Sequence, residues 1–369
     1  MKKVIFLILI MVLVGALFGA CGKPATEESI ESNPSTEEST SEAVEAASSV
    51  EIVTEVADED VIDSSSLKVP AKGLKFGLIA HDRAIEWVNY GCLNFEYACN
   101  LLGIEPVIVD AQNNMEKVLS GMEDLLTQGV DAVSVYSFSP DLDARICKMA
   151  RDAGIPVIME NAKVSDNIDC DANSAFGYVE VGTEVAKYIE ANYPGSKVVY
   201  VMGQPGMNIV ELYEQALDAA AEKGAFTIVD RQPTNWTSEE AMNTMQNILQ
   251  SGREFDVIFS NNEQITKGVL AALEGAGLKG KYPIITTGGS PLGEKMIREG
   301  DIECTMDIPV SYQAMTAVKD MLKLLNGYSV EKFPNLPIIP ITKANVDTEL
   351  IKWPPSMDTV NALGGLLPE

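Results

Sequence analysis

The chain has 369 residues, and 54 acidic side chains against 27 Lys and Arg give it a formal net charge of −27 at pH 7. Nucleic acid is therefore a poor partner, because phosphate recognition relies on Lys and Arg. The hydrophobic fraction of 46% is ordinary for a globular protein. About 300 residues remain beyond the N-terminal segments described next, which is more than one core usually spans, so two lobes are expected.

The N-terminus carries an export signal. Lys2 and Lys3 precede an apolar run over residues 4–18 that contains no charge. A run of this length is too short to cross a bilayer comfortably, and small residues follow it, so cleavage after export is favoured over a stable membrane anchor. We expect residues 1–20 to be a signal peptide.

The end of this segment resembles a bacterial lipoprotein. The sequence LFGAC, ending at Cys21, is similar to the lipobox of that family, except that Phe18 stands where an aliphatic residue is usual. The resemblance implies that Cys21 is acylated and anchors the protein to the outer face of the cell membrane. The alternative is a plain signal peptide followed by an incidental cysteine.

Residues 21–67 are expected to form a disordered tether. No Lys or Arg lies between Lys23 and Lys68, and thirteen acids occur from Glu27 to Asp63. Such a stretch buries too little apolar surface to offset the entropy of ordering, and its like charges repel. The tether would hold the body of the protein away from the membrane.

The remaining cysteines and the single histidine predict no disulfide framework and no cofactor or metal centre. Five cysteines follow Cys21, an odd number without CxxC spacing, so small apolar core residues are the favoured interpretation. One histidine, His81, is insufficient for a multi-histidine metal site. The five are Cys92, Cys99, Cys147, Cys170 and Cys304.

Strand and helix patterns alternate along the body. Four short apolar runs read as buried strands, and a helical stripe after Asn113 and Asn114, both plausible N-caps, separates the second run from the third. A second set of four runs follows, with helical segments near 207–223, 237–251 and 263–276. This order predicts two α/β lobes with parallel sheets. The expected strands are 75–80, 106–110, 132–136 and 156–160, then 197–202, 226–230, 257–260 and 283–287.

Polar and aromatic residues follow these strands. In open α/β sheets, ligands bind beyond the carboxyl ends of the strands, so residues there are the candidates for function. Aromatic rings can stack on the C–H face of a sugar ring, while amides and carboxylates pair with its hydroxyls, so a sugar or polyol site is predicted. The residues are His81, Asp82, Arg83, Trp87, Tyr136, Glu160, Asn161, Gln204, Asn235, Trp236, Asn261, Asn262 and Glu263.

Several segments together resemble the ribose and galactose type of periplasmic binding protein. The likeness extends from Leu74 to about Ile341. It implies the type I periplasmic binding protein fold, an α/β architecture of two Rossmann-like lobes with three hinge crossings near Ala172, Asp307 and Pro337, with ligand enclosed by hinge closure. The segments are DAQNN (110–114), CKMARDAGIPVI (147–158), MQNIL (245–249), FSNNE (259–263) and GSPLGEKMI (289–297).

The resemblance also implies domain boundaries and a partner. Residues 68–172 and 308–337 are assigned to the N-terminal lobe, and residues 173–307 and 338–369 to the C-terminal lobe. Members of this family deliver solute to an ABC permease, and a monomer is expected here.

Binding residues carried over from the resemblance come from both lobes. Trp87 and Trp236 fall at the positions of opposed sugar-stacking aromatics, and Asn262 matches an asparagine of the family's binding cleft. Asn161 matches the position of an acid that accepts sugar hydroxyls, and Tyr136 stands where an asparagine is usual.

Two departures put an aldopentose in doubt. The family's acid after the last strand of the second lobe is replaced by Gly288, and Glu211 and Tyr213 stand where an arginine is expected. Acceptors from other positions would then be needed, and whether His81, Glu211 or Tyr213 contacts ligand is left open. The candidate acceptors are Asp307, Glu160 and Asp82.

Structural interpretations compete with these assignments. A tryptophan is often a partly buried core residue, Asn261 and Asn262 could cap the next helix, and Glu160 could be an ordinary hinge-side carboxylate. The GQPG segment at 203–206 lacks P-loop spacing and is typical of a tight turn.

Three functions follow from the sequence. The favoured one is an importer-coupled solute-binding lipoprotein that is not an enzyme, since neither a GxSxG elbow nor a triad order is present. A surface sensor that presents a nucleoside or a signalling furanone to a membrane receptor is the alternative. A cell-surface carbohydrate-active enzyme is the third, and it would need a catalytic acid and base pair.

Overall fold

The computed structural model describes residues 52–162, 169–206 and 209–368. The expected signal peptide and the lipidation site at Cys21 lie outside the described residues, as does the tether up to residue 51. Within the described ranges, no helix combines the length and the apolarity needed to cross a membrane.

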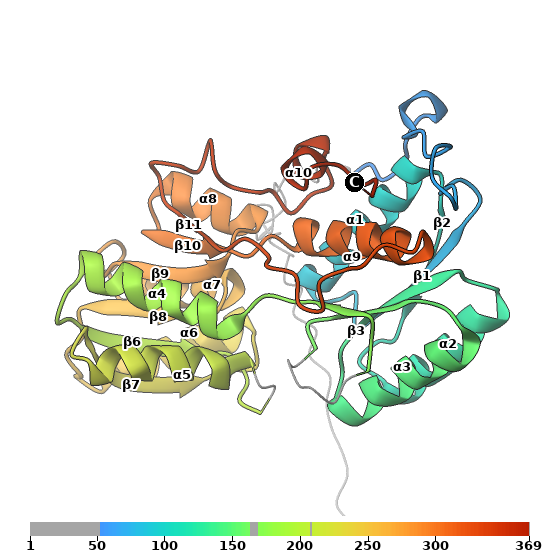
Figure 1. Cartoon of the computed structure of the whole chain (residues 1–369). Helices are drawn as coiled ribbons and strands as arrows, with labels where there is room; N and C mark the ends of the chain where they lie inside the picture. The colour runs from blue at the N-terminus through green and yellow to red at the C-terminus, as the bar shows by residue number, and fades with distance from the viewer. Residues whose placement is uncertain (1–51, 163–168, 207–208, 369) are drawn as a thin grey trace, which may run out of the picture. The chain divides into compact units, whose positions relative to one another are not determined.

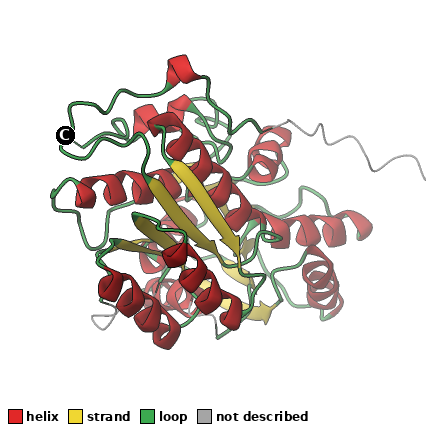
Figure 2. Ribbon diagram, turned by 90° about the vertical axis from the view of Figure 1, so that its right-hand side faces the viewer, coloured by secondary structure: helices red, strands yellow, loops and turns green. Residues whose placement is uncertain are grey.

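The first lobe is built on a five-stranded parallel sheet with strand order β2-β1-β3-β4-β5. Helices cover the strands on both sides (Figure 2), and every strand except the edge strand β2 is buried. Its elements in chain order are β1 (Lys75–Ala80), α1 (Glu86–Leu102), β2 (Glu105–Asp110), α2 (Met115–Thr127), β3 (Ala132–Tyr136), α3 (Pro140–Ala153), β4 (Val157–Glu160) and β5 (Ala172–Ser174), joined later by α9 (Val310–Leu325) and α10 (Met357–Ala362).

The second lobe has a six-stranded sheet with strand order β11-β10-β9-β8-β6-β7, in which only β11 runs antiparallel among the described strands. The two lobes and the return of α9 to the first one can be followed in Figure 1. Its elements are α4 (Tyr178–Asn192), β6 (Lys197–Met202), α5 (Ile209–Glu222), β7 (Thr227–Pro233), α6 (Ser238–Gln250), β8 (Val257–Ser260), α7 (Glu263–Gly275), β9 (Ile284–Gly288), α8 (Pro291–Glu299), β10 (Cys304–Asp307) and β11 (Ile339–Ile341).

The expected fold class is confirmed, and local signals explain the element boundaries. All eight strands predicted from apolar runs are present, with ends that differ by at most three residues. Asn114 caps α2, its side-chain oxygen accepting from the backbone N–H groups of Glu116 at 2.8 Å and Lys117 at 3.3 Å. Helix α1 ends at Gly103, whose φ of 67° suits glycine.

The chain passes between the lobes at the three expected places and then once more. It leaves the first lobe after β5, returns after β10 into α9, and crosses again before β11. A fourth crossing follows, because Val360 and Leu366 are buried in the core of the first lobe. The assignment of residues 338–369 to the C-terminal lobe is therefore wrong for the end of the chain, where the apolar side of α10 packs against α9.

The tether expected over residues 21–67 ends earlier in the structure. Val56, Ile62 and Leu67 pack against the core of the first lobe, and the Ile62 N–H donates to the Leu101 carbonyl at 2.7 Å. A 3₁₀-helix also forms at Asp58–Asp60. The acidic composition of this stretch predicted disorder, but its three apolar residues pack on the lobe and hold the segment there.

The five cysteines in the described residues are buried, as expected for core residues, and they are free thiols in this structure. They belong to the apolar cores: Cys92 and Cys99 to one side of the first sheet, Cys147 and Cys170 to the other, and Cys304 to the second lobe.

Leu366→Ala should destabilise the protein by about 2 to 4 kcal/mol, because Leu366 is 1% exposed in the core of the first lobe and its loss leaves a cavity. Met357→Ala in nearby α10 is the control, since Met357 is 45% exposed and should change stability by less than about 0.5 kcal/mol. Urea unfolding of both variants measures the difference. Equal losses of stability in the two variants would contradict the burial of Leu366 in the first lobe.

Candidate functional site

The carboxyl ends of the strands carry most of the predicted site residues. His81, Asp82 and Arg83 follow β1. The His81 ring stacks on Phe138, with centroids 4.2 Å apart, and burial lowers the pKa of His81. The Arg83 guanidinium donates to the Asn89 side chain at 3.0 and 3.1 Å, and Asp82 accepts from the backbone N–H of Ala84. Asp82 and Arg83 are thus partly used in holding the loop between β1 and α1.

Trp87 lies in the first turn of α1 and packs against the cores of both lobes. Its ring meets Trp353 edge-on at 5.1 Å and Phe176 edge-on at 5.9 Å. Its indole N–H is buried and has no hydrogen-bond partner among the described residues. The aromatic neighbours of Trp87 are therefore Phe176 and Trp353.

Glu160 ends β4 and is completely buried. Its carboxylate accepts from Ser134 Oγ at 2.6 Å and from Gln313 Nε2, on α9, at 3.0 Å. Burial raises the pKa of Glu160, and the three hydrogen-bonding neighbours only partly offset this effect. With neutral donors around it, Glu160 is a firmly placed hydrogen-bonding group at the end of the sheet.

Tyr136 ends the neighbouring strand β3, and its hydroxyl packs onto α1. A Cβ added to Gly91 would lie 1.9 Å from Tyr136 Oη, so this close approach requires glycine. Burial, and then the negative charge of Glu160, raise the pKa of Tyr136. The hydroxyl is buried without a hydrogen-bond partner of normal geometry in the described part of the chain.

Asn161 and Trp236 hold uncommon backbone conformations. Their φ angles are 54° and 65°, in the left-handed region that a residue with a Cβ seldom adopts. Strain of this kind tends to occur at functional positions. The Asn161 side-chain oxygen is buried and unpartnered, and the Trp236 ring lies on Gly203, where a Cβ would come within 2.1 Å of the indole.

A pair of buried carboxyl groups marks the second lobe. Glu263, at the start of α7, accepts from the Gly289 N–H and from Thr305 Oγ1, both at 2.7 Å. Asp307 ends β10 and accepts from the Ile351 N–H at 2.9 Å, while its other oxygen is unpartnered. Burial raises the pKa of Glu263 to about 7, and burial together with the Glu263 charge raises that of Asp307 well above its usual range.

Glu263 occupies the space beside Gly288, the position where the resemblance led us to expect an acid. A Cβ on Gly288 would lie 1.8 Å from Glu263 Oε2, and Gly288 pairs with Asp307 across β9 and β10. The second lobe therefore presents a carboxyl group here, supplied by α7 rather than by β9.

Asn262 is an N-cap in this structure. Its side-chain oxygen accepts from the Ile265 N–H at 2.8 Å, which agrees with the alternative interpretation given above. Asn261 holds Tyr200 Oη at 2.8 Å and the Gly203 N–H at 2.7 Å, and its amide nitrogen is unpartnered.

Glu211 and Tyr213, whose roles the sequence left open, have structural partners. Glu211 accepts from the Gly206 N–H at 2.6 Å, and the buried Tyr213 hydroxyl meets Thr287 Oγ1 at 3.2 Å.

Unpartnered polar atoms collect at the strand ends. Nine buried side-chain N or O atoms of the described residues have no hydrogen-bond partner, and seven of them lie at a strand's carboxyl end or in the first turn of the next helix. Since more than nine-tenths of buried polar groups in proteins are paired, such a concentration indicates a place for a polar ligand. The seven belong to His81, Trp87, Tyr136, Asn161, Asn261, Asp307 and Gln313.

The two sets of strand ends contact each other directly. Gln264, at the start of α7, donates to the Glu86 carboxylate at 3.1 Å, so the helix that follows β8 touches the helix that follows β1. Trp353 donates from its indole nitrogen to the Gly288 carbonyl at 3.0 Å, and its own carbonyl accepts from Asn94 at 2.6 Å. The final crossing segment thus joins β9 to α1 beside Trp87.

Trp353, Phe176, Ser134 and Gln313 were missed as candidates from the sequence. Trp353 and Phe176 lie in connecting segments, and Ser134 sits inside a strand. Gln313 could have been found from the sequence, because it lies shortly after the candidate residue Asp307, in the first turn of the next helix.

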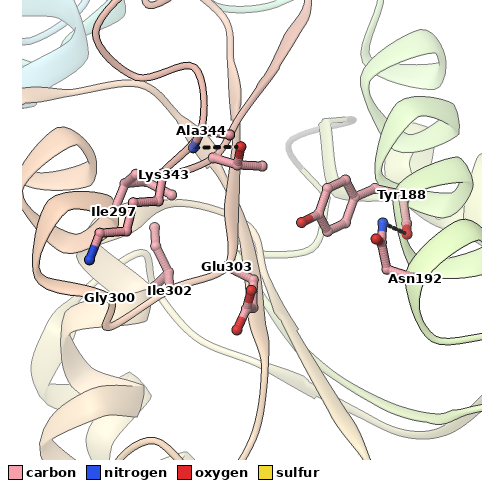
Figure 3. Close-up of a pocket in the computed structure, with 9 residues that line it drawn as sticks. Tyr188, Asn192, Ile297, Gly300, Ile302, Glu303, Lys343 and Ala344 are labelled. Atoms are coloured by element: carbon pink, nitrogen blue, oxygen red, sulfur yellow. Dashed lines mark hydrogen bonds between the residues drawn. The ribbon is translucent and has the colours of Figure 1, made fainter.

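A surface groove of about 480 Å³ lies elsewhere. It is lined in part by Tyr188, Glu303 and Lys343 (Figure 3). Ile302 and Glu303 precede β10, so this groove is at the amino end of that strand, opposite the end that carries Asp307. Among the described residues there is no cluster of His, Cys, Asp or Glu suited to a metal ion.

These observations define an α/β solute-binding protein of two lobes with a polar and aromatic site at the strand ends. The chain belongs to the periplasmic binding protein domain family, whose profile matches residues 76–329. The resemblance to the ribose and galactose type is thereby confirmed, and the family is one of extracytoplasmic binding proteins rather than enzymes, as expected.

Individual relatives agree with this assignment. A putative rhizopine-binding protein of Rhizobium meliloti is 28% identical over 265 residues, 68% of this chain and 84% of the relative. The ribose import binding protein of Salmonella typhimurium is 27% identical over 235 residues, 63% of this chain and 79% of the relative. The crystal structure of a Caulobacter myo-inositol binding protein has a TM-score of 0.67 at 24% identity, covering 76% of this chain and 97% of that one.

Glu263→Gln should reduce the loss of stability on going from pH 5 to pH 8. The pKa of Glu263 rises from 4.5 to about 7 on folding, so between these values the folded state binds more protons than the unfolded chain. The free energy of unfolding therefore falls as pH rises through this window, by roughly 3 kcal/mol from this group.

Urea unfolding at both pH values measures the change. Glu299→Gln on the half-exposed end of α8 is the control and should keep the wild-type pH dependence. If Glu263→Gln had the same dependence as wild type, the charge state assigned to this group would be wrong.

Proposed function

We propose that the protein binds a monosaccharide or polyol between its two lobes and delivers it to an ABC permease. The observation that carries the proposal is that seven buried polar atoms without hydrogen-bond partners, the Trp87 indole N–H among them, belong to residues at the strand ends. A sugar supplies hydroxyl groups for such atoms and a C–H face for the indole. The relatives named for ribose and myo-inositol support this ligand class.

The roles of the residues follow from their positions. Trp87 provides the stacking surface in the first lobe and Trp236 the aromatic side chain of the second. Tyr136 and Asn161 offer a hydroxyl and an amide oxygen beside Glu160, and Asp307 offers a carboxyl oxygen from the other lobe. Asp82, Arg83 and Asn262 contribute mainly by shaping the loops that carry the site.

The mechanism is hinge closure driven by contacts to both lobes. A ligand shifts a conformational equilibrium only through its different affinity for the two states. A solute that pairs with Tyr136 on one lobe and with Asp307 on the other gains both contacts only when the lobes are closed, so it stabilises that state.

The finer parts of the proposal concern the N-terminus and assembly. We propose that Cys21 carries the lipid anchor, that the acidic segment up to about residue 51 is the tether, and that the protein acts as a monomer. The support is the lipobox-like LFGAC sequence and the charge pattern that follows it. Globomycin sensitivity of processing and sedimentation of the mature protein test these points.

Trp87→Ala should lower affinity for the best solute at least tenfold, because a ring stacked on a desolvated sugar contributes about 1 kcal/mol or more beyond its buried area. The solute is first found by thermal shift against sugars, polyols and nucleosides, and affinity is then measured by calorimetry. Tyr328→Ala, an aromatic residue 44% exposed, is the control and should bind normally. A nucleoside as the only hit would favour the sensor alternative over sugar import.

Tyr136→Phe should weaken binding about tenfold and change stability little, because its hydroxyl makes no hydrogen bond of normal geometry within the described residues. Tyr213→Phe is the matched variant: its hydroxyl meets Thr287, so we expect a stability loss of about 1 kcal/mol and ordinary affinity. Calorimetry and urea unfolding on both variants separate the two effects. If Tyr136→Phe bound the solute normally and lost stability, the assignment of Tyr136 to the binding site would be wrong.

A further inference from the structure

Two of the buried cysteines face each other in the first lobe. Cys147 lies on α3 with no exposure, and Cys170 lies two residues before β5 and is 7% exposed. Both belong to the same apolar core and line the same groove, and the two thiols influence each other's ionisation. The strand-end site uses neither of them.

Surrounding contacts hold the two segments in this register. Arg151 lies one helical turn after Cys147 on the same side of α3. Its guanidinium donates to the Asp169 carbonyl at 2.8 Å and pairs with the Asp169 carboxylate at 2.6 Å. On the other side of Cys170, the Asp171 carboxylate accepts from the Val157 N–H at 2.8 Å. Cys170 is thus fixed opposite Cys147 by its two neighbours in sequence.

The surroundings also favour a thiolate at Cys170. Lys332 Nζ donates to the Cys170 carbonyl. The hydrogen bond from Cys147 and the positive charge of Lys332 lower the pKa of Cys170 to about 7, against the effect of burial. Cys147, by contrast, has its pKa raised by that hydrogen bond and by burial, with Asp143 adding a small effect. One sulfur is therefore the nucleophile and the other remains a thiol.

The pair borders a surface groove, and Cys170 is the more exposed of the two. A groove of about 330 Å³ is lined by Cys147 and Cys170, together with Arg151 and Asp171. The other three cysteines of the described residues, Cys92, Cys99 and Cys304, do not line this groove, and burial raises their pKa. Reactivity is thus confined to one pair.

We propose that Cys147 and Cys170 form an oxidation site that closes into an intramolecular disulfide in the exported protein. The oxidant is a disulfide, on a protein or a small molecule. The Cys170 thiolate attacks one of its sulfurs, and the other sulfur leaves and takes up a proton. Cys147 then loses its proton and attacks the Cys170 sulfur of this mixed disulfide, so that the bond to the oxidant breaks and the oxidant's second sulfur leaves as a thiol. Two protein thiols are oxidised to one disulfide while the oxidant is reduced to two thiols. An extracytoplasmic location provides such oxidants.

The cross-link would join α3 to the strand from which the chain leaves the first lobe. Because β5 is the last strand before the first crossing, the disulfide would fix the lobe side of that crossing. It also fits the odd number of cysteines in the described body, since one pair is used and three remain as core residues.

The test is a peptide map of the full-length protein after incubation with oxidised glutathione at pH 7.5. Thiols are alkylated with iodoacetamide in denaturant, and the digest is analysed by mass spectrometry. We expect a linked pair of peptides containing Cys147 and Cys170, lighter than the two separate peptides by two hydrogen atoms, with Cys92, Cys99 and Cys304 alkylated. Alkylation of both Cys147 and Cys170, or a link between any other pair, overturns the proposal.

Three variants complete the test. Cys304→Ser should still form the link, whereas Cys147→Ser should leave Cys170 as a mixed disulfide with glutathione, and Cys170→Ser replaces it if Cys147→Ser does not fold. Reduction with dithiothreitol should lower the melting temperature of the oxidised wild type by roughly 5 °C. For Cys147→Ser, which loses glutathione but no cross-link, the change should be much smaller. A wild-type protein that forms the link but does not respond to reduction would show that the link does not constrain the crossing.

Discussion

The architecture depends on burying polar groups at the ends of two parallel sheets without satisfying all of them internally. Glu160, Glu263 and Asp307 are buried beside neutral donors rather than cations. Burying a charge without a counter-charge is costly, and the raised pKa values of these acids express that cost. The rest of the fold, with helices on both faces of each sheet, supplies the apolar stability that such an arrangement requires.

The crossings between the lobes bring distant parts of the sequence to this place. Gln313 reaches Glu160 because α9 returns to the first lobe directly after Asp307, and Trp353 lies beside Trp87 because the chain crosses a fourth time. Closely spaced crossings restrict the relative motion of two lobes to a hinge. The same segments that connect the lobes therefore also supply side chains near the site.

The sequence was informative wherever a signal is local. Buried strands appear as short apolar runs, so the positions of eight of them were predicted within a few residues, and the carboxyl-end rule then located Tyr136 and Glu160 at strand ends. It failed where contacts are made between distant segments. Nothing near Glu263 indicates that its side chain fills the space beside Gly288, and nothing near Leu366 indicates packing on α9, because both depend on the path of the whole chain. Asn262 shows a different limit, since N-capping and ligand binding favour the same residue type at the same position.

Stability and specificity are linked at these strand ends. An unpaired buried polar atom costs about 1 to 3 kcal/mol, so several of them weaken the protein when no solute supplies the missing partners. A solute with hydroxyl groups in matching positions recovers that free energy, whereas one that lacks a hydroxyl leaves a buried atom unpaired and binds correspondingly less well. The indole of Trp87, with its own unpartnered N–H, combines both requirements in one side chain: it needs an apolar face above its ring and an acceptor at its edge. A cyclic polyhydroxylated molecule meets both, which is why the arrangement selects this class of solute over an apolar molecule of the same size.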